Sequence, residues 1–236
     1  MTNKPREFLY DMTNMTACAT TIALNLLITS GEDREMASED AKNLRKMAHG
    51  VKVCFLLWVT RRFVEYLVMR FPELKSKQQE IFQSLSASPS ANGYAIEYKD
   101  KEGKVSFIAE IRSESPYLNE GRAFDDEQKT KITDDLRGLR KGKPKSKLGL
   151  KDGNSLKGYH RFFGMFDGNK DKTKKAMKSL YKTITGDADY GRIKFLDKKA
   201  QLKDLDKNTI YIVLFDNVRL DNKPTCKSGK AAPADI

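Results

Sequence analysis

The chain has 236 residues and carries 44 Lys and Arg against 32 Asp and Glu, a formal net charge of +12. Its hydrophobic share of 39% is sufficient for a buried core, and its mean hydropathy of −0.62 indicates a polar surface. Three widely separated cysteines exclude a disulfide framework and a zinc site of ordinary spacing, which predicts a cytoplasmic protein. The apolar run at residues 17–28 is too short to span a bilayer, and no membrane association is expected.

The positive charge is concentrated in one segment. Residues 137–182 hold 15 Lys and Arg but three Asp and Glu, whereas the rest of the chain is formally neutral. A local positive field of this kind attracts polyanions. Within it, residues 138–149 form a basic, turn-forming run typical of a phosphate-contacting loop, with candidate contacts at Lys141, Lys143, Lys145 and Lys147. A solvated lysine-rich surface and a nuclear-localisation signal are alternative interpretations of the same composition.

Residues 1–85 are predicted to form a helical N-terminal region. Helical patterns cover residues 8–28, 38–50 and 51–71, and the last is apolar over so much of its surface that it should be buried. Residues 84–91 are small and form a linker.

Residues 92–112 predict a β-hairpin whose second strand is central and buried. This strand ends in Glu110-Ile-Arg112, so two charged side chains lie on one face. Centring the turn near residues 101–102 pairs residues whose numbers sum to about 203. Glu110 would then lie opposite Gly93 and beside Asn92, with Glu97 roughly 13 Å away along the strand.

The remaining pattern predicts a helix at residues 124–139, a core strand at 159–166, a helix at 172–181 and a buried strand at 209–215. The aromatic residues of the first of these strands are assigned to the core rather than to base stacking. The expected fold is α/β (α+β), a mixed β-sheet flanked by helices. The predicted divisions are a helical region at 1–85, an α/β core at 86–220 and a flexible tail at 221–236.

The hairpin, the sequence Ala-Glu-Ile-Arg at its end and the following helix resemble the PD-(D/E)xK nuclease superfamily, which includes many restriction endonucleases. The resemblance covers about residues 92–216 and its motif is degenerate: Arg112 stands at the superfamily's lysine, and Asn92 stands at its upstream aspartate. It implies a restriction-endonuclease-like fold and metal-dependent cleavage of DNA. The implied metal is Mg²⁺ or Mn²⁺, held by Glu110, by the backbone carbonyl of Ile111 and by the amide oxygen of Asn92. Arg112 would stabilise charge on the phosphate.

Three further residues are candidates through the same resemblance. Glu65, in the helix before the hairpin, matches an additional metal ligand, but an ion pair with Arg61 one turn away is the favoured explanation. Gln128 and Lys131 lie in the helix after the motif and would face the nucleic acid, the alternative being a solvated helix face.

Three functions remain open from the sequence. The first is a magnesium-dependent DNA endonuclease of the restriction type acting on double-stranded DNA, with a homodimer left open. The second is a nuclease-like protein that binds nucleic acid without cutting it. The third is an interaction or regulatory protein whose basic face meets an acidic partner.

Overall fold

The computed structural model describes residues 34–85, 93–113, 116, 123–166, 172–184 and 191–215. Its helices are α2 (Arg34–Arg70), α3 (Gln78–Ser84), α4 (Asp126–Lys141) and α5 (Lys172–Ile184), with 3₁₀ helices η1 (Pro72–Lys77) and η2 (Leu202–Asp204). Its strands are β1 (Ile96–Lys99), β2 (Ser106–Arg112), β3 (His160–Phe166), β4 (Arg192–Phe195) and β5 (Thr209–Phe215). The predictions for residues 8–28, for Asn92 and for the tail at 221–236 lie outside the described residues.

The five strands form one mixed sheet in the order β1-β2-β3-β5-β4. β1 pairs with β2 antiparallel, and β2, β3, β5 and β4 run parallel to one another. β2 is therefore an interior strand, and residues 106–111 are buried. The mixed sheet flanked by helices confirms the predicted fold class, while the finer restriction-endonuclease-like arrangement stays a prediction.

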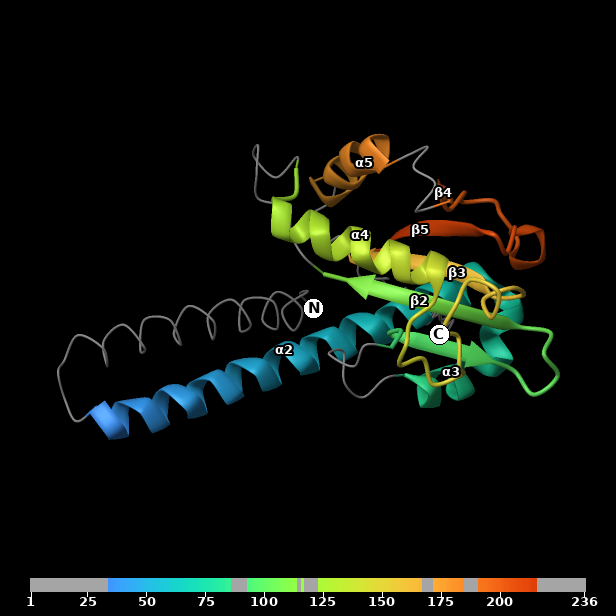
Figure 1. The fold of residues 1–236 in the computed structure, drawn as a ribbon. Coiled ribbons are helices and arrows are strands. Elements are labelled where there is room, and N and C mark those ends of the chain that lie inside the picture. Colours follow the sequence, from blue (N-terminus) through green and yellow to red (C-terminus); the bar gives the residue numbers. More distant parts are fainter. Residues whose placement is uncertain are drawn as a thin grey trace, which may run out of the picture.

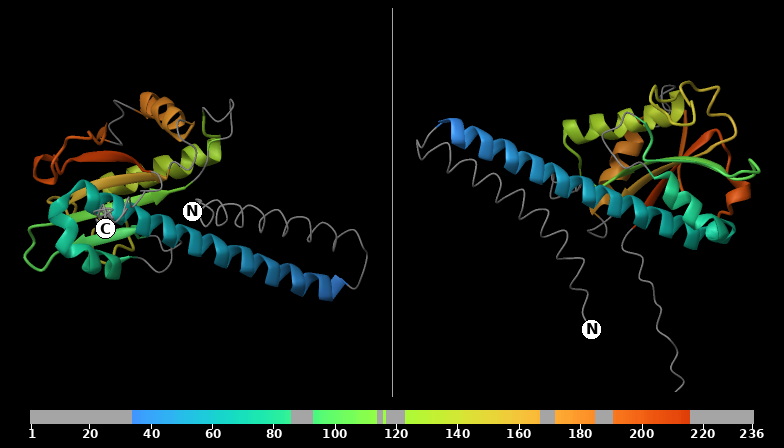
Figure 2. Two further views of the ribbon diagram at one scale, coloured as in Figure 1. Left: turned by 180° about the vertical axis from the view of Figure 1, so that it is seen from behind. Right: turned by 90° about the horizontal axis from the view of Figure 1, so that it is seen from below.

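Helices cover both faces of the sheet (Figure 1). α2, η1 and α3 lie on one face, and α4 and α5 lie on the other, as Figure 2 shows from two further directions. Each face has its own apolar cluster: Phe63, Leu67 and Phe107 belong to the first, and Ile108, Leu136 and Met177 to the second. The structure is thus a sheet between two helical layers.

The helix α2 is continuous through Gly50, where the sequence pattern predicts an end. A glycine inside a helix costs only about 1 kcal/mol, which the residues on either side can offset. The carboxyl-terminal half of α2 packs on the sheet, and its other half extends beyond it (Figure 2). Among the described residues, no helix combines the length and apolar character needed to cross a membrane.

The hairpin register differs from the prediction by two residues. Ile96 pairs with Ala109 and Lys99 with Ser106, so paired numbers sum to 205 rather than 203. The turn is closed by a hydrogen bond from Asp100 N to Val105 O, with Gly103 at φ 69°. Glycine adopts this left-handed conformation at little cost, which centres the turn one residue later than expected.

The contact between α2 and the sheet depends on a glycine in β3. A Cβ added to Gly164 would lie 2.7 Å from the ring of Phe63, which is fully buried, and 3.3 Å from Ile111. Phe63 also packs edge-on against Phe215 of β5, with ring centroids 5.1 Å apart. The ring is therefore held between two strands and has little freedom to move away.

Gly164→Ala is expected to destabilise the protein by about 1–3 kcal/mol, because the new methyl group overpacks a rigid aromatic contact. Gly50→Ala provides the control: nothing lies within 4 Å of the added Cβ on this exposed helical position, and a gain of about 0.5–1 kcal/mol is expected. Urea unfolding followed by circular dichroism measures both. Equal effects of the two substitutions would contradict the packing of α2 on β3.

Candidate functional site

Glu110 and Arg112 lie on the face of the sheet that α4 covers. Alternation along β2 directs Ala109 and Ile111 to the cluster beneath α2, so that Glu110 and Arg112 emerge on the opposite side. There Arg112 forms an ion pair with Asp135 of α4, with an Nε–Oδ2 distance of 2.5 Å, and Glu110 lies near the same carboxylate. The strand and the following helix thus bring together two carboxylates and one guanidinium.

The cation nearest to Glu110 is Lys143, from the loop after α4. Its ammonium forms an ion pair with Glu110 Oε1, lies 3.2 Å from Asp135 Oδ1 and donates a 3.3 Å hydrogen bond to the backbone carbonyl of Gly93. Three oxygens from three separate segments therefore surround one positive charge. With Arg112 also bound to Asp135, the cluster has two cations and two carboxylates.

The path of the Lys143 side chain explains a glycine inside α4. A Cβ on Gly138 would lie 2.6 Å from Lys143 Cε, so the lysine packs against the bare backbone of this glycine and would have to shift to admit a larger residue. Tyr94 closes the other side: its hydroxyl donates a 2.9 Å hydrogen bond to Gly138 O, and its ring centroid lies 5.5 Å from Lys143 Nζ. The ammonium is thereby enclosed, with most of its side chain shielded from solvent.

The pKa values of the cluster follow from this enclosure. Burial, followed by the negative charge of Asp135, raises the pKa of Glu110 from 4.5 to about 8, although Lys143 and Arg112 act in the opposite direction. Burial alone would lower the pKa of Lys143, but Glu110 and Asp135 raise it above its ordinary value. Lys143 is therefore firmly charged, and Glu110 binds a proton more readily than an exposed carboxyl does.

A divalent metal would need the oxygens that now surround Lys143. Glu110, Asp135 and the Gly93 carbonyl are hard ligands of the kind that Mg²⁺ prefers, but the lysine ammonium already holds the position between them. No group of three His, Cys, Asp or Glu side chains with metal-site geometry occurs in the part of the chain that the structure describes. The residues present fit an internal ammonium better than a divalent ion.

The other predicted site residues are not gathered around Glu110. Glu65 lies on α2, which packs on the opposite face of the sheet, and it forms ion pairs with Arg62 at 2.5 Å and Arg61 at 3.7 Å. The side chain of Ile111 belongs to the cluster beneath α2, while its backbone carbonyl, the predicted ligand, stays a prediction. The simpler interpretation of Glu65, an ion pair within its own helix, matches the structure.

Gln128 and Lys131 have local partners. Gln128 completes a capping box at the start of α4: its backbone N–H donates to Asp125, and its side chain accepts from the Asp125 N–H. Lys131 forms an ion pair with Glu127 at 2.5 Å on the exposed side of the helix. Both contacts stabilise α4, and neither directs the side chain toward Glu110.

The four lysines of the basic run occupy two different environments. Lys141, Lys145 and Lys147 are exposed, whereas Lys143 is the largely buried partner of Glu110. Glu97 of β1 holds their loop in place by accepting hydrogen bonds from the Ser146 hydroxyl at 2.8 Å and the Leu148 N–H at 2.9 Å. Lys143 therefore differs from the other three, which remain candidates for contact with phosphate.

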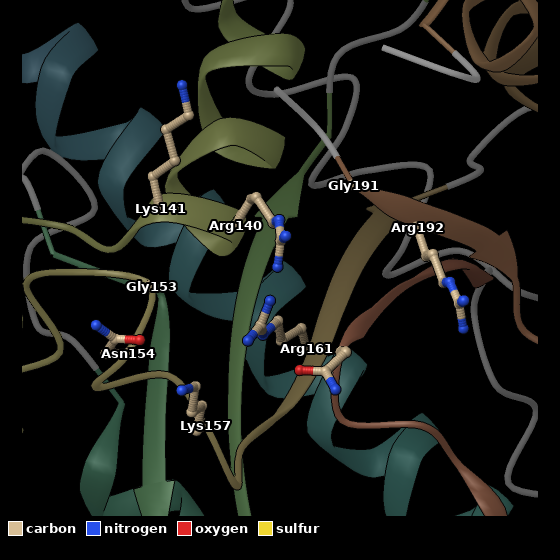
Figure 3. Close-up of a pocket in the computed structure, with 9 residues that line it drawn as sticks. Arg140, Lys141, Gly153, Asn154, Lys157, Arg161, Gly191 and Arg192 are labelled. Carbon is tan, nitrogen blue, oxygen red and sulfur yellow. The ribbon is translucent and has the colours of Figure 1, made fainter. Parts of the chain in front are cut away.

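A cavity of about 680 Å³ opens at the amino ends of β3, β4 and β5, beside the end of α4 (Figure 3). Its lining residues come from α4, from the loop after it and from the starts of these strands. They are Arg140, Lys141, Gly153, Asn154, Lys157, Arg161, Gly191, Arg192 and Asn208. Five of the nine are cationic and none is acidic, so the cavity attracts anions.

Arg161 forms the buried part of this cavity. The residue is 1% exposed, and its hydrogen bond to Leu156 O is a long one, 3.5 Å from Nη2. Nε and Nη1 have no hydrogen-bond partner among the described residues. Figure 3 shows its guanidinium facing that of Arg140, and burial followed by repulsion from Arg140 lowers the pKa of Arg161. A buried guanidinium whose N–H groups have no hydrogen-bond acceptor is costly unless an anion accepts those hydrogen bonds.

Sequence reasoning misses this cavity although one signal for it exists. Arg161 interrupts the otherwise apolar and aromatic strand β3, and a charge at such a position needs a partner. Arg192 begins β4, which is missed because it has only four residues, two of them basic. No protein-family model, curated protein or solved structure matches the chain.

Replacing the shared ammonium tests the carboxylate cluster. Lys143→Met should destabilise the protein by about 3 kcal/mol at pH 9, because the ionised carboxylate of Glu110 is left without its nearest cation. The destabilisation should shrink toward pH 7: wild-type Glu110 already binds a proton below its pKa of about 8, and the variant, whose folded-state Glu110 pKa lies higher still, loses stability relative to wild type only as pH rises above that value.

Lys145→Met, which removes an exposed charge from the same loop, is the control and should change stability little at either pH. Adding Glu110→Gln to Lys143→Met should recover much of the stability at pH 9. A destabilisation that is independent of pH, or that Glu110→Gln does not relieve, would contradict the ion-pair arrangement.

Proposed function

We propose that the protein binds the phosphate backbone of nucleic acid through the cationic edge of its sheet, without a metal ion bound at Glu110. The observation that carries this proposal is the cavity lining, which has five cations and no carboxylate. Surface cations usually occur with acidic neighbours, as on the exposed face of α4, where Lys129 and Lys131 pair with Asp126 and Glu127. A concave site lined by cations and by no carboxylate favours an anionic ligand.

The basic surface continues beyond the cavity along the loop after α4. Lys141 and Lys157 line the cavity, while Lys145 and Lys147 are exposed on the loop between them. A ligand that engages this whole surface must carry repeated negative charges. A phosphate backbone provides them, and arginine guanidinium groups bind phosphate in a bidentate manner.

An acidic protein partner is the competing binding function. Asn154 and Asn208 beside the cations supply neutral hydrogen-bonding groups that suit phosphate and sugar as well as carboxylate. Competition separates the two classes. Poly-glutamate displaces either kind of partner through its charge. For a site that binds phosphate, as proposed, it should be a weaker competitor than an oligonucleotide of equal charge.

A metal-dependent endonuclease is the second candidate, favoured by one observation. Glu110, Asp135 and the Gly93 carbonyl converge on a single cation, as oxygen ligands do around a divalent ion. For cleavage, Lys143 would have to leave this position, and Arg112 would have to act while bound to Asp135. Because displacing Lys143 costs its ion pairs with Glu110 and Asp135, binding without cleavage is the better-supported function.

Charge reversal tests the proposed interface. Lys141→Glu, Lys145→Glu and Lys147→Glu together should weaken binding to duplexes of every sequence, because phosphate contacts carry no sequence information. The slope of log affinity against log salt should flatten by about 0.9 for each phosphate that the protein no longer neutralises. Fluorescence anisotropy across a series of NaCl concentrations measures both quantities.

The matched control reverses three lysines on the other helical layer, in α2 and η1: Lys46, Lys75 and Lys77. This variant has the same net charge but should retain the wild-type slope apart from a small long-range effect. Identical weakening in the two triple variants would assign the binding to net charge alone and contradict a defined interface.

A cleavage assay decides between the two candidates. Wild-type protein incubated with supercoiled plasmid and Mg²⁺ or Mn²⁺ is expected to leave the plasmid intact while shifting its mobility by binding. Nicking or linearisation that disappears in Glu110→Ala and persists in Lys75→Ala would instead establish the endonuclease and refute binding without cleavage.

A further inference from the structure

The cavity at the amino edge of the sheet is a built site for one particular anion. Arg161 enters it from β3, where the side chain is 1% exposed and two of its three nitrogens have no hydrogen-bond partner among the residues described. Arg140 enters from the end of α4, and its guanidinium lies close enough to Gly191 that a Cβ there would be 2.7 Å from Arg140 Nε. Two like charges are thus held facing each other at one place (Figure 3).

Ordinary structural roles account for only part of this arrangement. Cations in the last turn of a helix interact favourably with its dipole, which suffices for Arg140 and Lys141. Arg161 is in a strand and gains nothing from the dipole. Arg192 has a loose, largely exposed ion pair with Asp206 at 3.8 Å, so some of its charge is already balanced. Within the described part of the cavity, the facing charges of Arg161 and Arg140 are the ones that most need an anion.

The charge and size of the cavity identify the class of ligand. Two facing guanidinium groups are best balanced by about two negative charges, which a phosphate monoester carries near neutral pH and which a carboxylate or an internal phosphodiester does not. A volume of about 680 Å³ exceeds that needed for inorganic phosphate and lies within the range of small-molecule sites. It therefore accommodates the phosphate together with an attached nucleoside.

We infer that this cavity binds a terminal phosphate monoester, either of a free nucleotide or of a nucleic-acid strand end, with Arg161 and Arg140 as its ligands. A group must enter the cavity to reach a side chain that is 1% exposed, and a strand end can do so more easily than a phosphodiester flanked on both sides. That the phosphate belongs to a nucleic-acid strand rests on the proposed function. The phosphate site itself does not depend on that function.

The test compares matched ligands in buffer free of phosphate and sulfate. A 5′-phosphorylated oligonucleotide should bind about tenfold more tightly than the same strand with a 5′-hydroxyl, since it adds charge-assisted hydrogen bonds to a desolvated guanidinium. A 3′-phosphorylated strand shows whether one end is preferred. A nucleoside 5′-monophosphate should raise the melting temperature of the protein, and the nucleoside alone should not.

Arg161→Met separates the site from general nucleic-acid binding. It should remove the advantage of the phosphorylated end and the thermal shift by the monophosphate, and it should weaken binding of the hydroxyl-ended strand far less than binding of the phosphorylated strand. Its melting temperature without ligand should equal or exceed that of wild type, because a buried, incompletely paired charge is gone. Should this variant fail to fold, Arg140→Met at the mouth of the cavity serves instead, with the same expected result.

Lys75→Met, which removes one charge from η1, is the matched control and should leave all of these measurements unchanged. Equal affinity for phosphorylated and hydroxyl-ended strands, together with no thermal shift by the monophosphate, would overturn the inference while leaving nucleic-acid binding intact. A thermal shift by the monophosphate without affinity for any strand would retain the phosphate site and refute the proposed function.

Discussion

The ammonium of Lys143 connects segments that are distant in sequence. Glu110 belongs to β2, Asp135 to α4 and the Gly93 carbonyl to the segment before β1, and all three oxygens surround this one charge. The interaction fixes α4 against the sheet and positions the start of the loop at residues 142–159, which Glu97 also holds through Ser146 and Leu148. That loop and the end of α4 supply five of the nine cavity-lining residues. The cavity therefore depends on a buried ion-pair cluster that is not itself part of the cavity lining.

Two cations on the same face of the sheet have contrasting surroundings. Lys143 is surrounded by two carboxylates and a backbone carbonyl. Arg161 has no negative group in hydrogen-bonding contact among the described residues. It lies on the adjacent strand, two positions before the register partner of Glu110. On ideal sheet spacing the Cα atoms of Glu110 and Arg161 are about 8 Å apart. Tyr94 interacts with both sites: burial and then Glu110 raise its pKa, while Arg161 acts against them. The cluster around Lys143 stabilises the fold, and Arg161 is the group through which the proposed anion would bind.

Local patterns predict much of this fold, because alternation and turn residues determine where β2, β3 and β5 form and place Glu110 and Arg112 on one face. They do not predict the partner of Glu110, since Lys143 returns to it only after a complete helix and its path depends on the missing Cβ of Gly138. The hairpin register depends on one left-handed glycine, Gly103. The cavity requires the parallel order of β3, β5 and β4, which brings together Arg161 and Arg192 from positions 31 residues apart. Non-local pairing of this kind leaves no periodic signal in the sequence.

The most direct measurement is an NMR titration that observes the arginine Nε–H and lysine NH₃⁺ groups, assigned through Arg161→Met and Lys143→Met. A 5′-phosphorylated oligonucleotide, added first alone and then with Mg²⁺, should shift the Arg161 signal at the first step and leave the Lys143 signal in place at both. Release of the Lys143 ammonium on addition of Mg²⁺, with an Arg161 signal that does not respond to the oligonucleotide, would contradict an anion site beside a permanently neutralised carboxylate cluster.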